Sequence, residues 1–93
     1  MMFDPLLHQA IRSKLVSLLI ANEELPFKAL KETLAVTDGN LSTHLSKLEK
    51  EEYVCIEKTF EGKRPKTVIR ITKVGRKAFD AYIETLKSFI EEN

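Results

Sequence analysis

Apolar residues recur at helical spacing in several stretches of the chain, which predicts amphipathic helices. The first stretch carries Leu7, Ile11, Leu15, Leu18 and Leu19. Asp4 before Pro5 is typical of a helix start, because aspartate caps the first amides and proline suits the first helical position. The pattern therefore predicts a first helix from Pro5 to about Asn22.

The segment "EELPF" interrupts this periodicity. Leu25-Pro26 is predicted to form a very short edge strand, because only an edge tolerates a residue without a ladder donor. "FKALKETLA" has the spacing of a short second helix, and "VTDGN" indicates a tight turn. Thr37 is predicted to cap a third helix. Its apolar positions are Leu41, Leu45 and Leu48.

The pattern changes after "EKEE", where "YVCIEKTF" and "TVIRIT" are β-branched and alternate in polarity, as strands do. "EGKRPK" between them is predicted to be a hairpin loop because it holds Gly62 and Pro65. Thr72 then caps a last helix, from Lys73 to about Glu91. We expect one α+β domain over residues 1–93, mainly α with a small β-hairpin, in the order α-β-α-α-β-β-α. This order describes a winged helix-turn-helix, with its recognition helix at about 38–51 and its wing at about 54–72.

The third helix has an unusual outer face. Opposite the apolar positions it carries small, hydrogen-bonding or basic side chains, whereas long acidic residues appear only at its far end, at Glu49, Glu51 and Glu52. Small polar side chains suit entry into a DNA major groove. Gly39 would let the first-turn amides approach a phosphate, although the glycine could instead serve only the turn. The predicted DNA-binding residues here are Thr37, Gly39, Asn40, Ser42, Thr43, Ser46, Lys47 and Lys50.

Charge is concentrated in one segment although the formal net charge of the chain is only +1. Residues 57–77 hold eight basic and two acidic residues, a local excess of six positive charges. Such a block beside a helix-turn-helix is the footprint expected for phosphate binding, whereas alone it could be a solvated loop. The predicted DNA-binding residues of the wing are Lys58, Lys63, Arg64 and Lys66.

The run "VTDGNLSTHLSKLEKEEYV", followed by "FEGKRPKTVIRITKVGRKAF", resembles a small prokaryotic winged-helix family related to the MarR and ArsR transcription regulators. The likeness extends over nearly the whole chain, including "DPLLHQAIRSKLVSLL". It implies a compact DNA-binding regulator that acts as a homodimer, with a recognition helix at 38–51 and a wing centred on 62–66. One departure is "KEEY", where the family usually has a glycine before the tyrosine, so the turn there is expected to differ.

The last helix is too apolar for one buried face. One face can pack on the core, and we expect the other to form a symmetric dimer together with the first helix. A loosely exposed helix is the alternative. The predicted interface residues are Leu6, Leu7, Phe79, Tyr82, Ile83, Leu86, Phe89 and Ile90.

The sequence offers little for metal or redox chemistry. One cysteine and two histidines, His8 and His44, form no cluster with metal-ligand spacing, so we expect no metal and no cofactor. Cys55 is expected to be a buried small apolar residue, and His44 to hydrogen-bond within the fold. The lone cysteine, and the absence of a recognisable signal or membrane span, favour a cytoplasmic protein. The sequence identifies no small-molecule effector.

The sequence bears on three classes of function. The leading hypothesis is a sequence-specific regulator of double-stranded DNA, acting as a homodimeric repressor by occlusion. The alternative is a winged helix used for protein binding or dimerisation, with incidental DNA contact. An enzyme is not expected, because there is no glycine-rich phosphate loop, activated nucleophile or carboxylate pair in a recognisable context.

Overall fold

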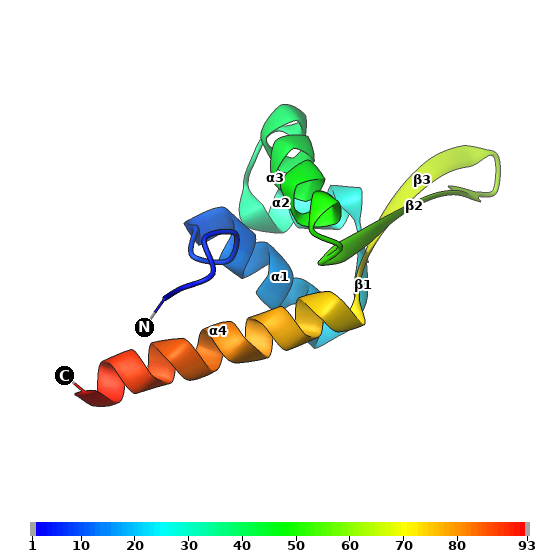
Figure 1. Ribbon diagram of the computed structural model, residues 1–93. Coiled ribbons are helices and arrows are strands. Elements are labelled where there is room, and N and C mark those ends of the chain that lie inside the picture. The colour runs from blue at the N-terminus through cyan, green and yellow to red at the C-terminus, as the bar shows by residue number, and fades with distance from the viewer. Residues whose placement is uncertain (1, 93) are drawn as a thin grey trace.

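Seven helices and strands account for most of residues 2–92, the part of the chain described by the structure, which is a computed structural model (Figure 1). They are α1 (Ala10–Asn22), β1 (Glu24–Pro26), α2 (Phe27–Leu34), α3 (Asp38–Lys50), β2 (Val54–Glu61), β3 (Arg64–Ile71) and α4 (Lys73–Glu92). Their order and the α+β class are those predicted from the sequence. The winged helix-turn-helix is confirmed: α2 and α3 are the helix pair, and β2 and β3 form the wing.

Two side-chain caps fix where α3 and α4 begin. The Thr37 hydroxyl accepts a hydrogen bond from the amide of Asn40 at 3.1 Å, and the Thr72 hydroxyl accepts one from the amide of Gly75 at 2.9 Å. Each bond satisfies an amide that has no carbonyl partner within the first helical turn. Both caps predicted from the sequence are therefore confirmed.

The predicted start of the first helix is wrong. α1 begins at Ala10, where the Gln9 side chain accepts from the amide of Arg12 at 2.7 Å. Asp4 is engaged elsewhere: one carboxylate oxygen accepts from the amide of Leu6 at 2.9 Å, and the other from the Tyr53 hydroxyl at 2.5 Å. An Asp-Pro pair also suits a turn, and the long-range bond to Tyr53 favours that turn over a helix cap.

The sheet has the strand order β1-β3-β2 and is antiparallel throughout. β1 pairs with β3 at the outer edge, with Pro26 opposite Val68, so the predicted edge strand is confirmed. β2 and β3 are paired along their whole length, from Val54 opposite Ile71 to Glu61 opposite Arg64. The central strand β3 therefore joins the body of the domain to the tip of the wing.

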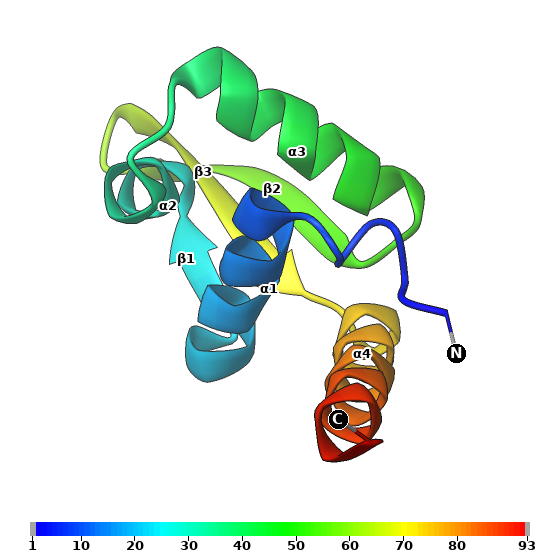
Figure 2. The ribbon, with the colours of Figure 1, turned by 90° about the vertical axis from the view of Figure 1, so that its left-hand side faces the viewer.

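The first three helices lie beside the base of the sheet (Figure 2). Their leucines supply much of the core. The largest fully buried side chains are Leu7, Leu15, Val16, Leu19, Leu30, Leu41, Leu48 and Ile69. Each contributes roughly 1.5–3 kcal/mol relative to an exposed position. Leu7 is 0% exposed within one chain, so its predicted place in a dimer interface is wrong.

Cys55 is exposed, which corrects the prediction that it would be buried. Alternation along β2 turns Val54 and Ile56 toward the helices and Cys55 to the other face of the sheet. Side chains alternate along β2 as predicted, but the face of the sheet that carries Cys55 is not covered.

α3 ends in a tight backbone motif that contains a non-glycine residue in the left-handed region. Glu52 has φ 62°, its amide donates to the Glu49 carbonyl at 2.9 Å, and the Tyr53 amide donates to the Leu48 carbonyl at 2.9 Å. This pair of bonds is a Schellman motif, in which glycine is the usual left-handed residue. It explains the "KEEY" departure: the geometry is retained with a glutamate in the glycine position.

α4 leaves the domain as a long arm (Figure 1). The principal extents of the molecule are 53 × 25 × 21 Å. The first turn of α4 packs closely because Gly75 has no side chain: a Cβ there would collide with the Tyr53 carbonyl. No helix among residues 2–92 is long and apolar enough to cross a membrane.

Candidate nucleic-acid interface

The outer face of α3 presents all eight residues predicted to contact DNA from this part of the chain. Each of them is exposed. Thr37 is occupied as the helix cap, and the Thr43 hydroxyl donates to the Gly39 carbonyl at 3.0 Å. The side chains of Asn40, Ser42 and Ser46 make no hydrogen bond within residues 2–92. Their donors and acceptors are therefore available to a partner.

Gly39 is not required by the fold. It lies inside α3 without a positive φ, and no atom lies within 4 Å of the place where a Cβ would stand. Neither turn conformation nor crowding within the chain explains a glycine that costs about 1 kcal/mol in a helix interior. The open space on this side of the first turn is where an external group could approach.

The turn between α2 and α3 is fixed at both ends. Ala35 adopts a left-handed conformation, φ 54°, directly after α2, and Lys31 forms an ion pair with Asp38 at 2.8 Å. Both partners are substantially exposed, so the pair itself adds little to stability. Its effect is to connect the last turn of α2 with the first turn of α3.

The wing carries its free charges at the tip. Gly62 has φ 65° in the turn, and Lys63 and Arg64 beside it are exposed and form no ion pair with any described residue. Lys66 is paired with Glu61 at 3.4 Å. The predicted wing residues are thus gathered near the tip, with part of their charge offset by one carboxylate.

The predicted wing residues do not all share one face of the hairpin. Lys58 continues the face that carries Val54 and Ile56, whereas Lys66 lies on the opposite face. Phe60, beyond Lys58 on the same face, is 70% exposed. Phe60 was not among the predicted site residues, although its place in an alternating strand beyond the core was the signal for its exposure.

The basic block of residues 57–77 is divided in space. Arg70 lies in the sheet between Glu24 and Glu57, at 3.0 and 3.5 Å from their carboxylates, so its charge is offset locally. Lys73 and Lys77 stand at the start of α4, at the opposite end of β3 from the wing tip (Figure 1). The charge that can act beside α3 is therefore smaller than the sequence count.

A groove of about 720 Å³ separates α2 from the wing. Lys28 lies on its α2 side, and Arg64 and Lys66 lie on its β3 side. Lys28 was not among the predicted site residues. The signal for it was its position in the first turn of the second helix, which a helix-turn-helix places close to the wing.

The other flank of α3 faces the start of α1. Arg12 is buried, its Nε donates to the Leu6 carbonyl at 2.7 Å, and its Nη1 lies 3.1 Å from Nδ1 of His44. Burial, and then the positive charges of Arg12 and Lys47, lower the pKa of His44 below its ordinary value. The expectation that His44 hydrogen-bonds within the fold is confirmed. The structure adds its partner, Arg12, which the sequence did not indicate.

The other residues predicted to form the dimer interface fall into three groups. Phe79 and Tyr82 pack against the core, and Tyr82 hydrogen-bonds His8 at 3.1 Å while Phe3 stacks on the His8 ring at 4.4 Å. Toward the end of α4, Phe89 and Ile90 are 50% and 63% exposed. Leu6, Ile83 and Leu86 are half-buried. The apolar surface available for a partner is therefore mainly at the far end of the arm.

Among residues 2–92 no group of three or more His, Cys, Asp or Glu side chains could hold a metal ion.

Known proteins are similar to this chain in sequence and in fold. A sequence model of the winged helix DNA-binding domain matches residues 11–90. An uncharacterized protein of Methanocaldococcus jannaschii is 45% identical over 76 residues, which cover 82% of this chain and 83% of that protein.

Two solved structures have the same fold. The structure of a transcriptional regulator homologue from Pyrococcus horikoshii superposes with a TM-score of 0.88 at 29% identity, covering 94% of this chain and 86% of the other. A MarR-family transcriptional regulator from Silicibacter pomeroyi superposes with a TM-score of 0.68 at 20% identity, covering 89% of this chain and 55% of the other. The resemblance noted in the sequence is confirmed, and the chain belongs to the winged helix DNA-binding domain family.

Proposed function

We propose that the protein is a sequence-specific transcriptional regulator that binds double-stranded DNA as a homodimer and represses by occlusion. The observation that carries the proposal is the outer face of α3, where Asn40, Ser42 and Ser46 are exposed and make no hydrogen bond within residues 2–92. Polar side chains on a helix that are not used by the fold are what base-edge recognition requires.

In this proposal α3 enters the major groove, which is about 12 Å wide and admits one helix. The absence of a side chain at Gly39 lets the first turn approach the phosphate backbone. Asn40 can form a bidentate contact with adenine, and the serine hydroxyls can donate to or accept from base edges. Substitutions at Asn40, Ser42, Thr43 or Ser46 should therefore change which sequence is preferred.

The wing supplies contacts that do not depend on sequence. Lys63 and Arg64 at its tip can neutralise backbone phosphates or enter a narrow minor groove. Each phosphate contact that is lost should lower the slope of log affinity against log salt by about one unit. Substitutions at Lys58, Lys63, Arg64 or Lys66 should weaken binding to all duplexes.

The proposed homodimer forms through α4, the long arm of the molecule. Ile90 is 63% exposed and Met2 89% exposed, and this apolar surface would be covered by a second copy of α4. Pairing through the arms would set two α3 helices on one face of the duplex, about one helical turn apart. Ile90→Asp should yield a monomer that still folds, as measured by sedimentation equilibrium and circular dichroism. An unchanged dimer in this variant would move the interface away from the arm.

The test of the function is selection of bound duplexes from a random pool, followed by affinity measurements across a salt series. A two-fold symmetric motif with a steep salt slope is the expected result. Weak binding without an enriched motif would reject the proposal in favour of a winged helix that binds protein. Reporter transcription from a promoter that overlaps the selected motif would then test repression, since activation would contradict occlusion.

A further inference from the structure

Arg12 is an unusual residue because it is a charged side chain with only 9% of its surface exposed and no carboxylate partner among residues 2–92. Its Nε and Nη1 are engaged by the Leu6 carbonyl and by His44. A buried cation is normally paired, because burial without a counter-ion costs several kcal/mol. The fold thus holds a guanidinium in place without supplying its anion.

The bond to His44 determines which nitrogen of that ring carries hydrogen. An arginine side chain has donors only, so Nδ1 of His44 must act as an acceptor and carries no proton. The hydrogen of the neutral ring is therefore on Nε2, and Arg12 positions the ring as well as setting this tautomer.

Two donors of this pair are free and reach the surface. Neither Nη2 of Arg12 nor Nε2 of His44 has a hydrogen-bond partner within residues 2–92, and no unpartnered polar side-chain atom in that range is fully buried. Both atoms must therefore be accessible. The fold therefore presents two unpartnered N–H groups, one on a cation and one on a neutral ring, from two side chains that are 3.1 Å apart at Nη1 and Nδ1.

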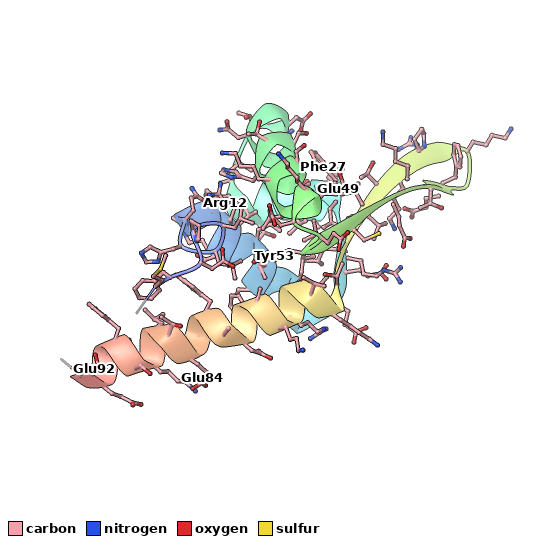
Figure 3. All side chains as sticks on the ribbon, viewed as in Figure 1. Arg12, Phe27, Glu49, Tyr53, Glu84 and Glu92 are labelled. Atoms are coloured by element: carbon pink, nitrogen blue, oxygen red, sulfur yellow. The ribbon has the colours of Figure 1, made fainter. Side chains whose placement is uncertain are left out.

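Arg12 and His44 lie on the side of α3 that would face one of the two phosphate backbones if α3 entered the major groove. Asn40, His44 and Lys47 follow one another at helical spacing along the same side of α3. Arg12 adjoins this side, whereas Glu49 and the wing lie on the other side of α3 (Figure 3). A helix in the major groove has phosphate backbone along both sides, and the wing can reach only one of them.

We propose that Arg12 and His44 together bind one phosphate of the DNA backbone, on the flank of α3 opposite the wing. Two N–H donors from hydrogen-bonded side chains, one of them charged, are the kind of group that binds the oxygens of a phosphodiester. Arg12 both contacts the phosphate and positions His44. The inference rests on the DNA-binding function proposed above and adds a second line of backbone contacts to it.

The test compares two substitutions of His44 on the selected duplex. His44→Gln keeps an acceptor toward Arg12 and an N–H toward the phosphate, so its affinity should stay within about twofold of the parent protein. His44→Phe keeps a ring but no donor, and it should weaken binding about fivefold, the loss of one hydrogen bond, without changing the salt slope. Equal affinities for the two variants would overturn the proposal.

Arg12→Met tests whether the charge of the guanidinium contributes to DNA binding. It should lower the salt slope by about one unit, whereas Lys87→Ala, which removes a positive charge from α4, should leave the slope unchanged. If Arg12→Met does not fold, the His44 pair alone decides. A wing variant, Lys63→Ala with Arg64→Ala, separates the two proposals. If it loses affinity while both His44 variants bind normally, only this inference fails, and if the parent protein binds no duplex, the proposed function fails as well.

The same pair could hold a free phosphate ion instead of the DNA backbone. Side-chain NMR signals of Arg12 and His44 should shift when duplex is added and should remain unchanged with inorganic phosphate at the same ionic strength. A saturable shift with inorganic phosphate, together with normal duplex binding by His44→Phe, would overturn the assignment to DNA.

Discussion

The carbonyl oxygen of Tyr53 occupies the space that a side chain on Gly75 would need, so α4 can begin where it does only because residue 75 is glycine. The same carbonyl accepts hydrogen bonds from the Thr72 hydroxyl at 3.0 Å and from the Thr72 amide at 3.2 Å. The start of α4 is thus attached to the end of α3 through backbone contacts as well as through side chains.

Alanine substitutions at two helical glycines should have opposite effects on stability. Gly75→Ala should lower the free energy of unfolding by about 2–3 kcal/mol, because overpacking against Tyr53 outweighs the gain in helix propensity. Gly39→Ala meets no atom within 4 Å and should raise the free energy of unfolding by about 0.5–1 kcal/mol while weakening DNA binding. Urea unfolding and duplex titration measure both effects, and a Gly39→Ala variant with full affinity would remove the role assigned to that glycine.

Glu52→Gly should stabilise the protein. The left-handed conformation of residue 52 costs a non-glycine residue about 1 kcal/mol, part of which is recovered by glycine despite its greater flexibility when unfolded. We expect the free energy of unfolding, measured by thermal unfolding, to be higher for the variant by roughly 0.5–1 kcal/mol. Glu52→Ala is the control for loss of the carboxylate at a helix C-terminus, worth a few tenths of a kcal/mol. Equal stability of the two variants would mean that backbone strain is absent at this position.

Acid should destabilise the fold through His44. Its pKa is lower in the folded protein, first because of burial and then because of Arg12 and Lys47, than the value of about 6.5 in the unfolded chain. The unfolded state therefore binds the proton more readily, so the stabilisation is complete above about pH 6.5 and is lost as the pH falls through the folded pKa. Unfolding free energies of the parent protein and of His44→Gln should converge or cross as the medium is acidified. A constant difference from neutral to acidic pH would contradict this.

Alkaline pH should destabilise the fold through Tyr53. Burial, followed by the hydrogen bond to Asp4, raises the pKa of Tyr53 to about 12. The unfolded phenol ionises near pH 10, so this contribution is present below about pH 10 and is lost as the pH rises through the folded value. Tyr53→Phe should cost about 1.5–3 kcal/mol at neutral pH, the range for a hydrogen bond to a charged group, and should lose this part of the alkaline dependence. Asp4→Asn, measured in parallel, should show a similar cost if the bond is the cause.

Periodicity and capping chemistry predicted most of the fold because the information is local. The spacing of the α3 leucines, the cap bonds of Thr37 and Thr72, and the missing amide donor of Pro26 are each properties of the residue itself or of neighbours within a few positions. The predicted helix start at Asp4 was wrong because the partner of Asp4, Tyr53, is distant in sequence. Nothing in the local sequence distinguishes an aspartate that caps a helix from one that accepts a bond from another part of the fold.

The candidate site likewise has features that local sequence predicts and features that it does not. The exposed polar face of α3 followed from its spacing, whereas the pairing of Arg12 with His44 depends on how α1 packs against α3. Leu7 and Cys55 show the same limit: periodicity indicates which residues share a face, and only the packed structure reveals whether that face is covered.

β3 has a mechanical consequence for the molecule. It is paired with β2 along its whole length, is joined to β1 and the core only at the end away from the wing tip, and continues from that end through Thr72 into α4. A displacement of Arg64 at the wing tip is therefore expected to be transmitted along the whole of β3 to the start of α4 at Lys73. Bending of the wing and the direction of α4 are therefore expected to be coupled, because one continuous segment joins them through the single residue Thr72.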